Sequence, residues 1–363
     1  MKMATVEDIR HTLREVNDPE LGQSLIHLEM VKTIQVTGEV VCITLALTTL
    51  ACPLKDRIVE DVKRVVLALP GVSRVEVDLV AMSPEERARV IEKANLKKDE
   101  PSPAQELNHI KRVVAVMSGK GGVGKSLVTS LLALALVRRG TKVGILDADV
   151  TGPSIPKIFG LRTRPEVSPF WLLPVCTKLG IRIMSINLLL EREDDAVIWR
   201  GPLISGAIKQ FWGDVIWGDL DYLLVDLPPG TADAPLTVMQ SLPVSGVVLV
   251  STPQDLAGMV VRKAMQMVQK LNKPILGVVE NMSYFVCPDT GKRHYIFGPS
   301  RGEEMARVAE APLLATLPID PELARLCDAG QIEEYESAAY QSLAEAFIGA
   351  DSPATTYVAQ AAR

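Results

Sequence analysis

Short, uninterrupted apolar runs recur along the 363-residue chain from about residue 111 and alternate with helical patterns, such as the one over residues 127–139. Runs of Val, Ile, Leu and Ala without polar alternation are typical of strands buried on both faces. Strands that alternate with helices indicate a doubly wound, mostly parallel α/β sheet covered on both faces. The runs are RVVAVM (112–117), KVGILD (142–147), IRIMSI (181–186), YLLVD (222–226), GVVLV (246–250), ILGVV (275–279) and LLATL (313–317).

The pattern differs over the first 92 residues, where helical segments flank a pair of strand signals joined by Thr37-Gly38. One predicted helix is charged, and the other carries apolar residues on a single face. This arrangement predicts a small α+β domain. Its expected elements are helices at about 5–16 and 53–69 and strands at 31–36, 40–47 and 72–80.

A polar segment that contains Pro101 and Pro103 separates the two patterns, and such a composition is typical of a linker. We therefore expect a small domain over 1–92, a linker over 93–110 and the sheet domain over 111–350. Small and polar residues over 351–363 predict a flexible tail.

Composition narrows the function classes. A formal net charge of −5 and a pI near 5.6 argue against a nucleic-acid binder with a broadly basic surface. No run of 18 apolar residues predicts a membrane span, and the charged N-terminus does not resemble a signal peptide. The five cysteines are scattered, so they do not indicate a disulfide framework. We expect a protein of the reducing cytoplasm, with no nucleic-acid or membrane partner.

The stretch SGKGGVGKS (118–126) satisfies two nucleotide-binding patterns at once. Gly119, Gly121 and Gly124 match the dinucleotide pattern G-x-G-x-x-G between a strand and a helix. Asp147 ends the next strand at nearly the spacing expected of a ribose-binding acid. This pattern alone predicts a dinucleotide such as NAD.

The same residues match the phosphate loop G-x-x-x-x-G-K-S/T, which also explains Lys125 and Ser126. In such a loop, backbone N–H groups surround phosphate oxygens, the lysine faces the β- and γ-phosphates and the hydroxyl binds Mg²⁺. A glycine-rich turn without a ligand is the alternative. The expected ATP-binding residues are Gly119, Lys120, Gly121, Gly122, Val123, Gly124, Lys125 and Ser126.

A second segment, YLLVDLPPGTAD (222–233), favours ATP over a dinucleotide. It is a buried strand that ends in Asp226 and is followed by a Pro-Pro-Gly loop. A carboxylate at such a strand end holds Mg²⁺ in P-loop proteins, although an acid there can also cap the next helix. We therefore expect ATP and Mg²⁺, with Ser126 as a metal ligand and Asp226 holding the metal through water.

The loop resembles the deviant Walker A signature K-G-G-x-G-K-S/T of the MinD, ParA and nitrogenase iron protein class. The resemblance implies a nucleotide-sandwich homodimer in which Lys120 crosses to the partner's nucleotide, as an arginine finger does. It also implies that Asp149 positions the attacking water and that Asp147 supports Mg²⁺. A solvated lysine and capping aspartates are the plainer alternatives.

A closer resemblance covers residues 111–345, where several separate motifs occur in the order seen in the Mrp/ApbC family of ATP-dependent iron–sulfur cluster carriers. It implies an ATPase that delivers clusters to apo iron–sulfur proteins together with assembly factors, with Asn281 contacting the adenine edge unless this residue only forms a turn. The motifs are VMSGKGGVGKS, DADVTGPSIP, WRGP (199–202), YLLVDLPPGTAD, STPQDLAG (251–258), ENMSYFVCP (280–288), IFGPS (296–300) and LPIDPEL (317–323).

The first domain agrees with this resemblance. The stretches VNDPELGQSLIHLEMV (16–31) and LTTLACPLKDRI (47–58) resemble the small domain of cytosolic iron–sulfur assembly factors. Cys52 precedes Pro53 at the start of a predicted helix, where the positive end of the helix dipole lowers a thiol pKa. We expect Cys52 to be a candidate cluster ligand.

The chain departs from the family at one place. Family members commonly carry C-x-x-C after the ENMS segment, so that a dimer holds a 4Fe-4S cluster with four thiolates. Here Cys287 is followed by Thr290 in place of the second cysteine. Cys287 can still anchor a labile cluster with other ligands, such as Cys52, Asp289 or a client donor, or cluster binding has been lost.

Three other functions are compatible with parts of this pattern. A regulator or scaffold ATPase of the MinD/ParA class that carries no cluster is the main alternative. A positioning or partition ATPase needs a basic or amphipathic terminus, which the tail lacks. A dinucleotide-dependent oxidoreductase leaves Lys125, Ser126 and Asp226 unexplained.

Overall fold

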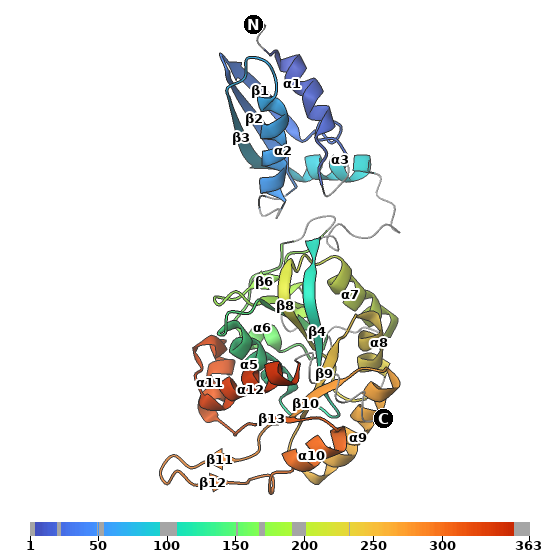
Figure 1. The fold of residues 1–363 in the computed structure, drawn as a ribbon, viewed down its shortest axis with the longest axis vertical. Helices are drawn as coiled ribbons and strands as arrows, with labels where there is room; N and C mark the ends of the chain where they lie inside the picture. Colours follow the sequence, from blue (N-terminus) through green and yellow to red (C-terminus); the bar gives the residue numbers. More distant parts are fainter. Residues whose placement is uncertain are drawn as a thin grey trace. The chain divides into compact units, whose positions relative to one another are not determined.

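The chain divides into two compact units, one over residues 1–105 and the other over most of the remaining chain (Figure 1). Each unit is described by itself below. The computed structural model describes residues 4–19, 23–48, 50, 54–94, 107–149, 152–166, 171–190, 201–231 and 233–351. In these residues, no helix is both long and apolar enough to cross a bilayer.

The smaller unit is an α+β domain, as predicted. Its three strands lie in the order β1-β2-β3, with β1 antiparallel and β3 parallel to β2. The buried side chains of Ile9, Leu13, Ile43, Ile58 and Val62 form its core. The helix α3 was not among the predicted elements. The elements are α1 (Val6–Thr12), η1 (Leu13–Glu15), β1 (Val31–Thr37), β2 (Val40–Leu47), α2 (Lys55–Leu67), β3 (Arg74–Ala81) and α3 (Pro84–Ala94).

The larger unit is built on a sheet that, in the described residues, has eight strands in the order β13-β10-β9-β4-β8-β5-β7-β6. The strands are parallel except β6, which runs antiparallel to β7. The predicted, mostly parallel sheet is thus confirmed. The strands are β4 (His109–Ser118), β5 (Val143–Asp147), β6 (Val175–Cys176), β7 (Arg182–Ser185), β8 (Asp219–Asp226), β9 (Gly246–Ser251), β10 (Ile275–Glu280) and β13 (Leu313–Thr316).

Helices cover both faces of this sheet, and each face has its own apolar core (Figure 1). Helices α5, α6, α11 and α12 contribute to one core, and α7 to α10 contribute to the other. Uniformly apolar strands are required because both of their faces are buried. The helices are α5 (Lys125–Val137), α6 (Ile155–Ile158), α7 (Gly201–Gly213), α8 (Asp233–Ser241), α9 (Asp255–Lys270), α10 (Gly302–Ala309), α11 (Pro321–Asp328) and α12 (Ala338–Ala350), with 3₁₀ turns η2 (Ile186–Leu188) and η3 (Ile332–Glu334).

A small hairpin between β10 and α10 was not predicted. It consists of β11 (Phe285–Val286) and β12 (Arg293–His294), paired antiparallel, and it projects from the body of the unit (Figure 1). Its strands are too short to produce a periodic hydrophobic signal. Strand β4 begins at His109, inside the segment expected to be a linker.

Parallel strands bring their carboxyl ends to one edge of the sheet. The register pairs Asp147 of β5 with Asp226 of β8, and Asp226 in turn with Val116 of β4. On the other side of β4, Ser118 pairs with Val250 of β9. The residues that end these strands therefore meet around the loop that follows β4, which is the usual ligand edge of an open α/β sheet.

Candidate functional site

The loop between β4 and α5 is shaped by glycine. Gly122 and Gly124 have φ angles of +77° and +78°, in the left-handed region that L side chains rarely adopt. A Cβ on Gly124 would also lie 2.2 Å from Nδ2 of Asn281. Glycine is therefore required at position 124, because of both its backbone conformation and the lack of space for a side chain. The backbone amides of the loop lie next to the N-terminus of α5.

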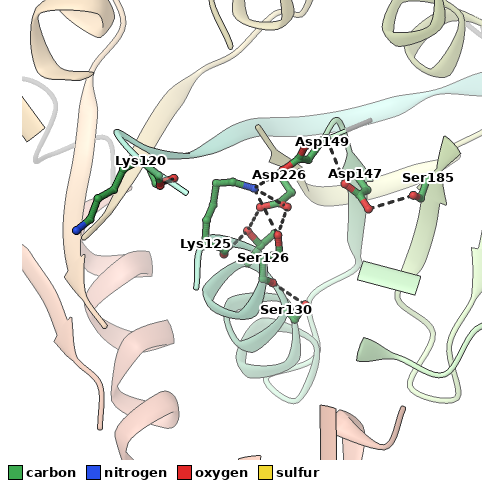
Figure 2. A network of polar contacts seen from close by, with 10 residues as sticks. Lys120, Lys125, Ser126, Ser130, Asp147, Asp149, Ser185 and Asp226 are labelled. Atoms are coloured by element: carbon green, nitrogen blue, oxygen red, sulfur yellow. Dashed lines mark hydrogen bonds and ion pairs between the residues drawn. The ribbon is translucent and has the colours of Figure 1, made fainter. Parts of the chain in front are cut away.

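Lys125 and Asp226 form a buried ion pair directly below this loop (Figure 2). The Lys125 Nζ lies 2.8 Å from Asp226 Oδ2, and the two residues are 6% and 0% exposed. Ser126 Oγ donates to Asp226 Oδ2 at 2.5 Å, and Thr129 Oγ1 donates to Asp226 Oδ1 at 2.8 Å. Every oxygen of this fully buried carboxylate thus has a partner, as a buried charge requires.

A cavity of about 300 Å³ opens onto these groups. It is lined by the loop residues from Lys120 to Leu127, by Asp149 and by Pro229. Loop amides, the positive end of α5 and Lys125 make it suited to phosphate oxygens. Ser126 and Asp226 supply a hydroxyl and a carboxylate oxygen side by side, the hard oxygen ligands that Mg²⁺ takes. These residues therefore fit Mg²⁺ and a nucleotide phosphate.

A larger cavity of about 580 Å³ lies at the opposite, amino-terminal ends of β4 and β8. Its lining includes Lys111 and Asp221, whose charged atoms pair at 2.7 Å. The lining includes no residue of the phosphate loop. The smaller cavity, which the phosphate loop lines, is therefore the candidate nucleotide site.

The two aspartates that follow β5 occupy different environments. Asp149 Oδ2 lies 4.0 Å from Lys125 Nζ and borders the phosphate cavity. Asp147 is fully buried and accepts hydrogen bonds from Ser185 Oγ at 3.0 Å and from the Asp149 amide at 3.2 Å (Figure 2). Burial, and then the nearby Asp226 carboxylate, raise the pKa of Asp147 to about 8. Through the hydrogen bond from the Asp149 amide, Asp147 positions Asp149, and its predicted role on Mg²⁺ remains a prediction.

Lys120 points away from the cluster around Asp226 (Figure 2). Its Nζ instead donates to Gln254 Oε1 at 2.6 Å, and its carbonyl accepts from Ser118 Oγ at 3.0 Å. This orientation leaves Lys125 as the lysine that faces the chain's own carboxylates. It is compatible with the expected action of Lys120 on a partner's nucleotide.

Asn281 follows β10 and is 3% exposed. Its Nδ2 donates to the carbonyl of Val123 at 2.9 Å, so the side chain contacts the phosphate loop itself. One N–H of the Asn281 side-chain amide is therefore used by the phosphate loop. The contact with adenine implied by the family resemblance remains a prediction.

Cys287 lies at the turn of the β11–β12 hairpin and is partly exposed. Its amide donates to the Lys292 carbonyl at 2.9 Å, which closes the turn. A hydrogen bond from the Thr290 side chain, followed by backbone amides at 290 and 289, lowers the pKa of the Cys287 thiol. Thr290 therefore favours the thiolate, which is the form that binds metal.

No group of three or more His, Cys, Asp or Glu side chains in the described ranges is close enough to hold a metal ion. Cys52, the second predicted cluster ligand, lies outside those ranges, as do residues 199–200 of the WRGP motif. Cys327 on α11 is partly buried, and burial raises its pKa to about 11. Its thiol is therefore protonated at neutral pH.

Sequence reasoning missed three side chains at this site: Thr129, Ser185 and Gln254. Thr129 follows Lys125 by one helical turn, so the spacing within α5 could have placed it beside Asp226. Ser185 and Gln254 are 38 and 134 positions from their partners, Asp147 and Lys120. No local pattern indicates such contacts.

The parallel sheet, the glycine loop and the Lys125–Asp226–Ser126 cluster define a P-loop nucleotide-binding protein. Comparison with known families narrows this class. A ParA family model described as NUBPL iron-transfer P-loop NTPase matches residues 109–348, and a model of iron–sulfur cluster assembly proteins matches residues 6–79.

Known proteins are similar in sequence to this chain over nearly its whole length. An iron–sulfur cluster carrier protein from Synechocystis sp. is 41% identical over 350 residues, covering 94% of this chain and 95% of the relative. One from Deinococcus radiodurans is 43% identical over 335 residues, covering 91% and 90%. A solved nucleotide-binding protein from Archaeoglobus fulgidus in complex with ADP has 50% identity and a TM-score of 0.58, and covers 65% of this chain and 93% of that one. The chain belongs to the iron–sulfur cluster carrier family of ParA-type P-loop NTPases, with a preceding iron–sulfur cluster assembly domain.

Proposed function

We propose that this protein hydrolyses ATP as a homodimer and uses the cycle to bind iron–sulfur clusters and transfer them to apo-proteins in a reducing cytoplasm. The observation that supports it best is the buried Lys125–Asp226 pair with Ser126 under a phosphate loop, in a chain of the cluster carrier family. Family membership supports the iron–sulfur cluster as cargo, and the geometry of the site supports ATP as the nucleotide.

Within one protomer, the loop amides and Lys125 hold the β- and γ-phosphates. Ser126, with Asp226 acting through water, would hold Mg²⁺, which would neutralise phosphate charge when bound. Thr129 fixes the orientation of the Asp226 carboxylate through its bond to Oδ1. Asp149, which borders the cavity beside Lys125, orients the attacking water and accepts its hydrogen bond.

Lys120 acts on the partner's nucleotide. Its ammonium is directed away from its own cluster, so closure of two protomers is required to add its charge to a phosphate group. This added charge stabilises the transition state in the manner of a residue supplied in trans. Hydrolysis then reopens the dimer.

The cargo is held by Cys287. Two protomers bring two such thiols, and each is made more acidic by Thr290. Since four ligands are usual for a 4Fe-4S cluster, the cluster is held loosely and is completed by Cys52, by Asp289 or by a donor of the client. Loose binding is suited to a carrier, which has to release its cargo. The alternative function, an ATPase scaffold without a cluster, rests on the replacement of the second family cysteine by Thr290.

The nucleotide half of the proposal is tested by ATP hydrolysis. Lys125→Ala removes the charge that faces the phosphates and is expected to abolish turnover, whereas Lys120→Ala is expected to retain nucleotide binding and lose turnover. Lys111→Ala, on the opposite edge of the sheet, is the matched control. Hydrolysis by Lys125→Ala at the parental rate would refute the loop assignment, and unchanged turnover in Lys120→Ala would refute the role in trans.

The cargo half is tested by anaerobic reconstitution with iron and sulfide. The parent is expected to develop visible charge-transfer absorbance, and Cys287→Ala to lose most of it. Cys52→Ala shows whether the first domain contributes a ligand, and Cys176→Ala is the matched control because Cys176 is an exposed thiol on β6. No cluster in the parent would favour the scaffold.

A further inference from the structure

Glu280 is a buried carboxylate that the nucleotide chemistry does not use. It ends β10 and is 0% exposed. It accepts hydrogen bonds from Ser283 Oγ at 2.5 Å, from Ser300 Oγ at 2.6 Å and from the Arg301 amide at 2.7 Å. A buried carboxylate is costly unless its oxygens accept hydrogen bonds, so the positions of these three donors stabilise Glu280 in the interior.

The three donors flank the segment that carries Cys287. Ser283 immediately precedes residues 284–299, and Ser300 and Arg301 immediately follow them. The Glu280 side chain thus binds both ends of the segment that contains the β11–β12 hairpin. Charge-assisted hydrogen bonds of this kind are about twice as strong as neutral ones.

The other described contacts of the hairpin lie within it or at its base, including the Arg293 guanidinium over the Tyr284 ring at 4.4 Å and the contact between the Tyr284 and Tyr295 rings. Residues 288–297 are all exposed, and β11 and β12 share only the pairs Phe285–His294 and Val286–Arg293. A bridge from Phe285 to Ile319 lies at its base, next to the bonds made by Glu280. The position of Cys287 relative to the core therefore depends strongly on that base.

The residue after Glu280 contacts the nucleotide loop. Asn281 Nδ2 donates to the Val123 carbonyl, its amide donates to the Ser251 carbonyl, and its side chain fills the space beside Gly124. Consecutive residues of one buried segment thus touch the phosphate loop and the base of the hairpin. Closely packed interiors transmit small displacements instead of absorbing them.

We propose that Glu280 is a positioning residue that couples the phosphate loop to the Cys287 hairpin, so that nucleotide binding changes the exposure of the Cys287 thiol. This inference rests on the proposed function for the meaning of Cys287 as the cargo ligand. The coupling itself is a property of the chain without cargo. It gives the carrier a route by which ATP at one place alters cluster retention at another.

The test measures how fast iodoacetamide labels Cys287 in the full-length protein without a cluster, with and without a non-hydrolysable Mg²⁺–ATP analogue. Peptide mapping by mass spectrometry isolates this thiol from the other cysteines. The variants are Glu280→Gln, which keeps the shape and removes the charge, and Ser300→Ala, which removes one donor. Glu304→Gln is the matched control, since this exposed acid in the first turn of α10 contacts the Arg301 side chain.

In the parent, nucleotide is expected to change the labelling rate by roughly fivefold or more, and in Glu280→Gln and Ser300→Ala this ratio is expected to fall to about twofold or less. Nucleotide affinity and the unfolding midpoint are measured on the same samples. A purely structural role would shift the midpoint and leave the ratio intact. If Glu280→Gln does not fold, Ser300→Ala decides the outcome.

A parent whose labelling is insensitive to nucleotide would overturn the coupling, as would variants that keep the full parental ratio. Neither result depends on a cluster. If reconstitution shows no cluster while the labelling ratio depends on Glu280, the proposed cargo is wrong and the coupling stands. If clusters form while nucleotide does not change the labelling rate, the proposed cargo stands and the coupling through Glu280 is wrong.

Discussion

Asp226 joins Lys125, Ser126 and Thr129 at the nucleotide site, so Asp226→Asn perturbs three contacts of that site at once. The substitution keeps the shape of the side chain and removes its charge. It leaves Lys125 with Asp149 as its charged neighbour, at 4.0 Å instead of the 2.8 Å of the original pair. It also replaces an acceptor-only group by an amide, whose NH₂ faces donors.

The magnitude follows from these distances. At an effective dielectric of about 20, the Lys125–Asp226 attraction is about 6 kcal/mol and the remaining Asp149 attraction is about 4 kcal/mol. Removing one partner of a buried pair costs about 3–5 kcal/mol. The low end applies here, because Asp149 remains and the repulsion between Asp226 and Asp147 disappears. For a unit of this size, a loss of about 3 kcal/mol lowers the unfolding midpoint by about 6–12 °C.

Differential scanning calorimetry without nucleotide measures this shift, and titration with ADP with and without Mg²⁺ measures the metal role. Asp226→Asn is expected to lose the gain in affinity that Mg²⁺ provides. Asp221→Asn is the matched control, because this acid on the same strand pairs with the exposed Lys111, and such surface pairs contribute little to stability. A midpoint for Asp226→Asn within about 2 °C of the parent, or above it, would refute the reasoning.

Three further predictions concern the surroundings of the site. Because burial raises the pKa of Asp147 from its ordinary value of 3.8 to about 8, the folded state loses stability as the pH rises between these two values; Asp147→Asn is expected to flatten the decline in unfolding midpoint between about pH 4 and pH 8, and an unchanged slope would contradict the assignment. Thr290→Cys adds a second thiol beside Cys287 and is expected to slow the loss of a reconstituted cluster by roughly tenfold, followed by absorbance after gel filtration; equal loss rates would exclude this position as a ligand site. Asp351→Asn weakens the paired hydrogen bonds from Arg112 that hold the end of α12, and should lower the unfolding midpoint by roughly 4–8 °C; a shift below about 1 °C would show that the pair is not structural.

Most of the sheet could be predicted from the chain alone, because strands buried on both faces have to be apolar throughout. The runs over 112–117, 142–147 and 222–226 fall within β4, β5 and β8 or extend one residue before them. The short hairpin around Cys287 escaped prediction because its two-residue strands are exposed and carry no periodic signal. Its position also depends on Glu280, whose partners become visible only when the chain is folded.

The phosphate loop could also be read from the sequence, since its glycines, Lys125 and Ser126 are contiguous and a local backbone shape requires them. The position of Asp226 could also be predicted, because an acid at the carboxyl end of a buried parallel strand lies at the edge of the sheet where ligands bind. The direction in which Lys120 points could not be read, because it is set by Gln254, 134 positions away. The sequence by itself thus determined the elements and the contiguous part of the nucleotide site, whose causes are local. Only the tertiary structure decided which distant side chains orient Asp226, Asp147 and Lys120 and connect the loop to Cys287, because those contacts depend on strand order and packing.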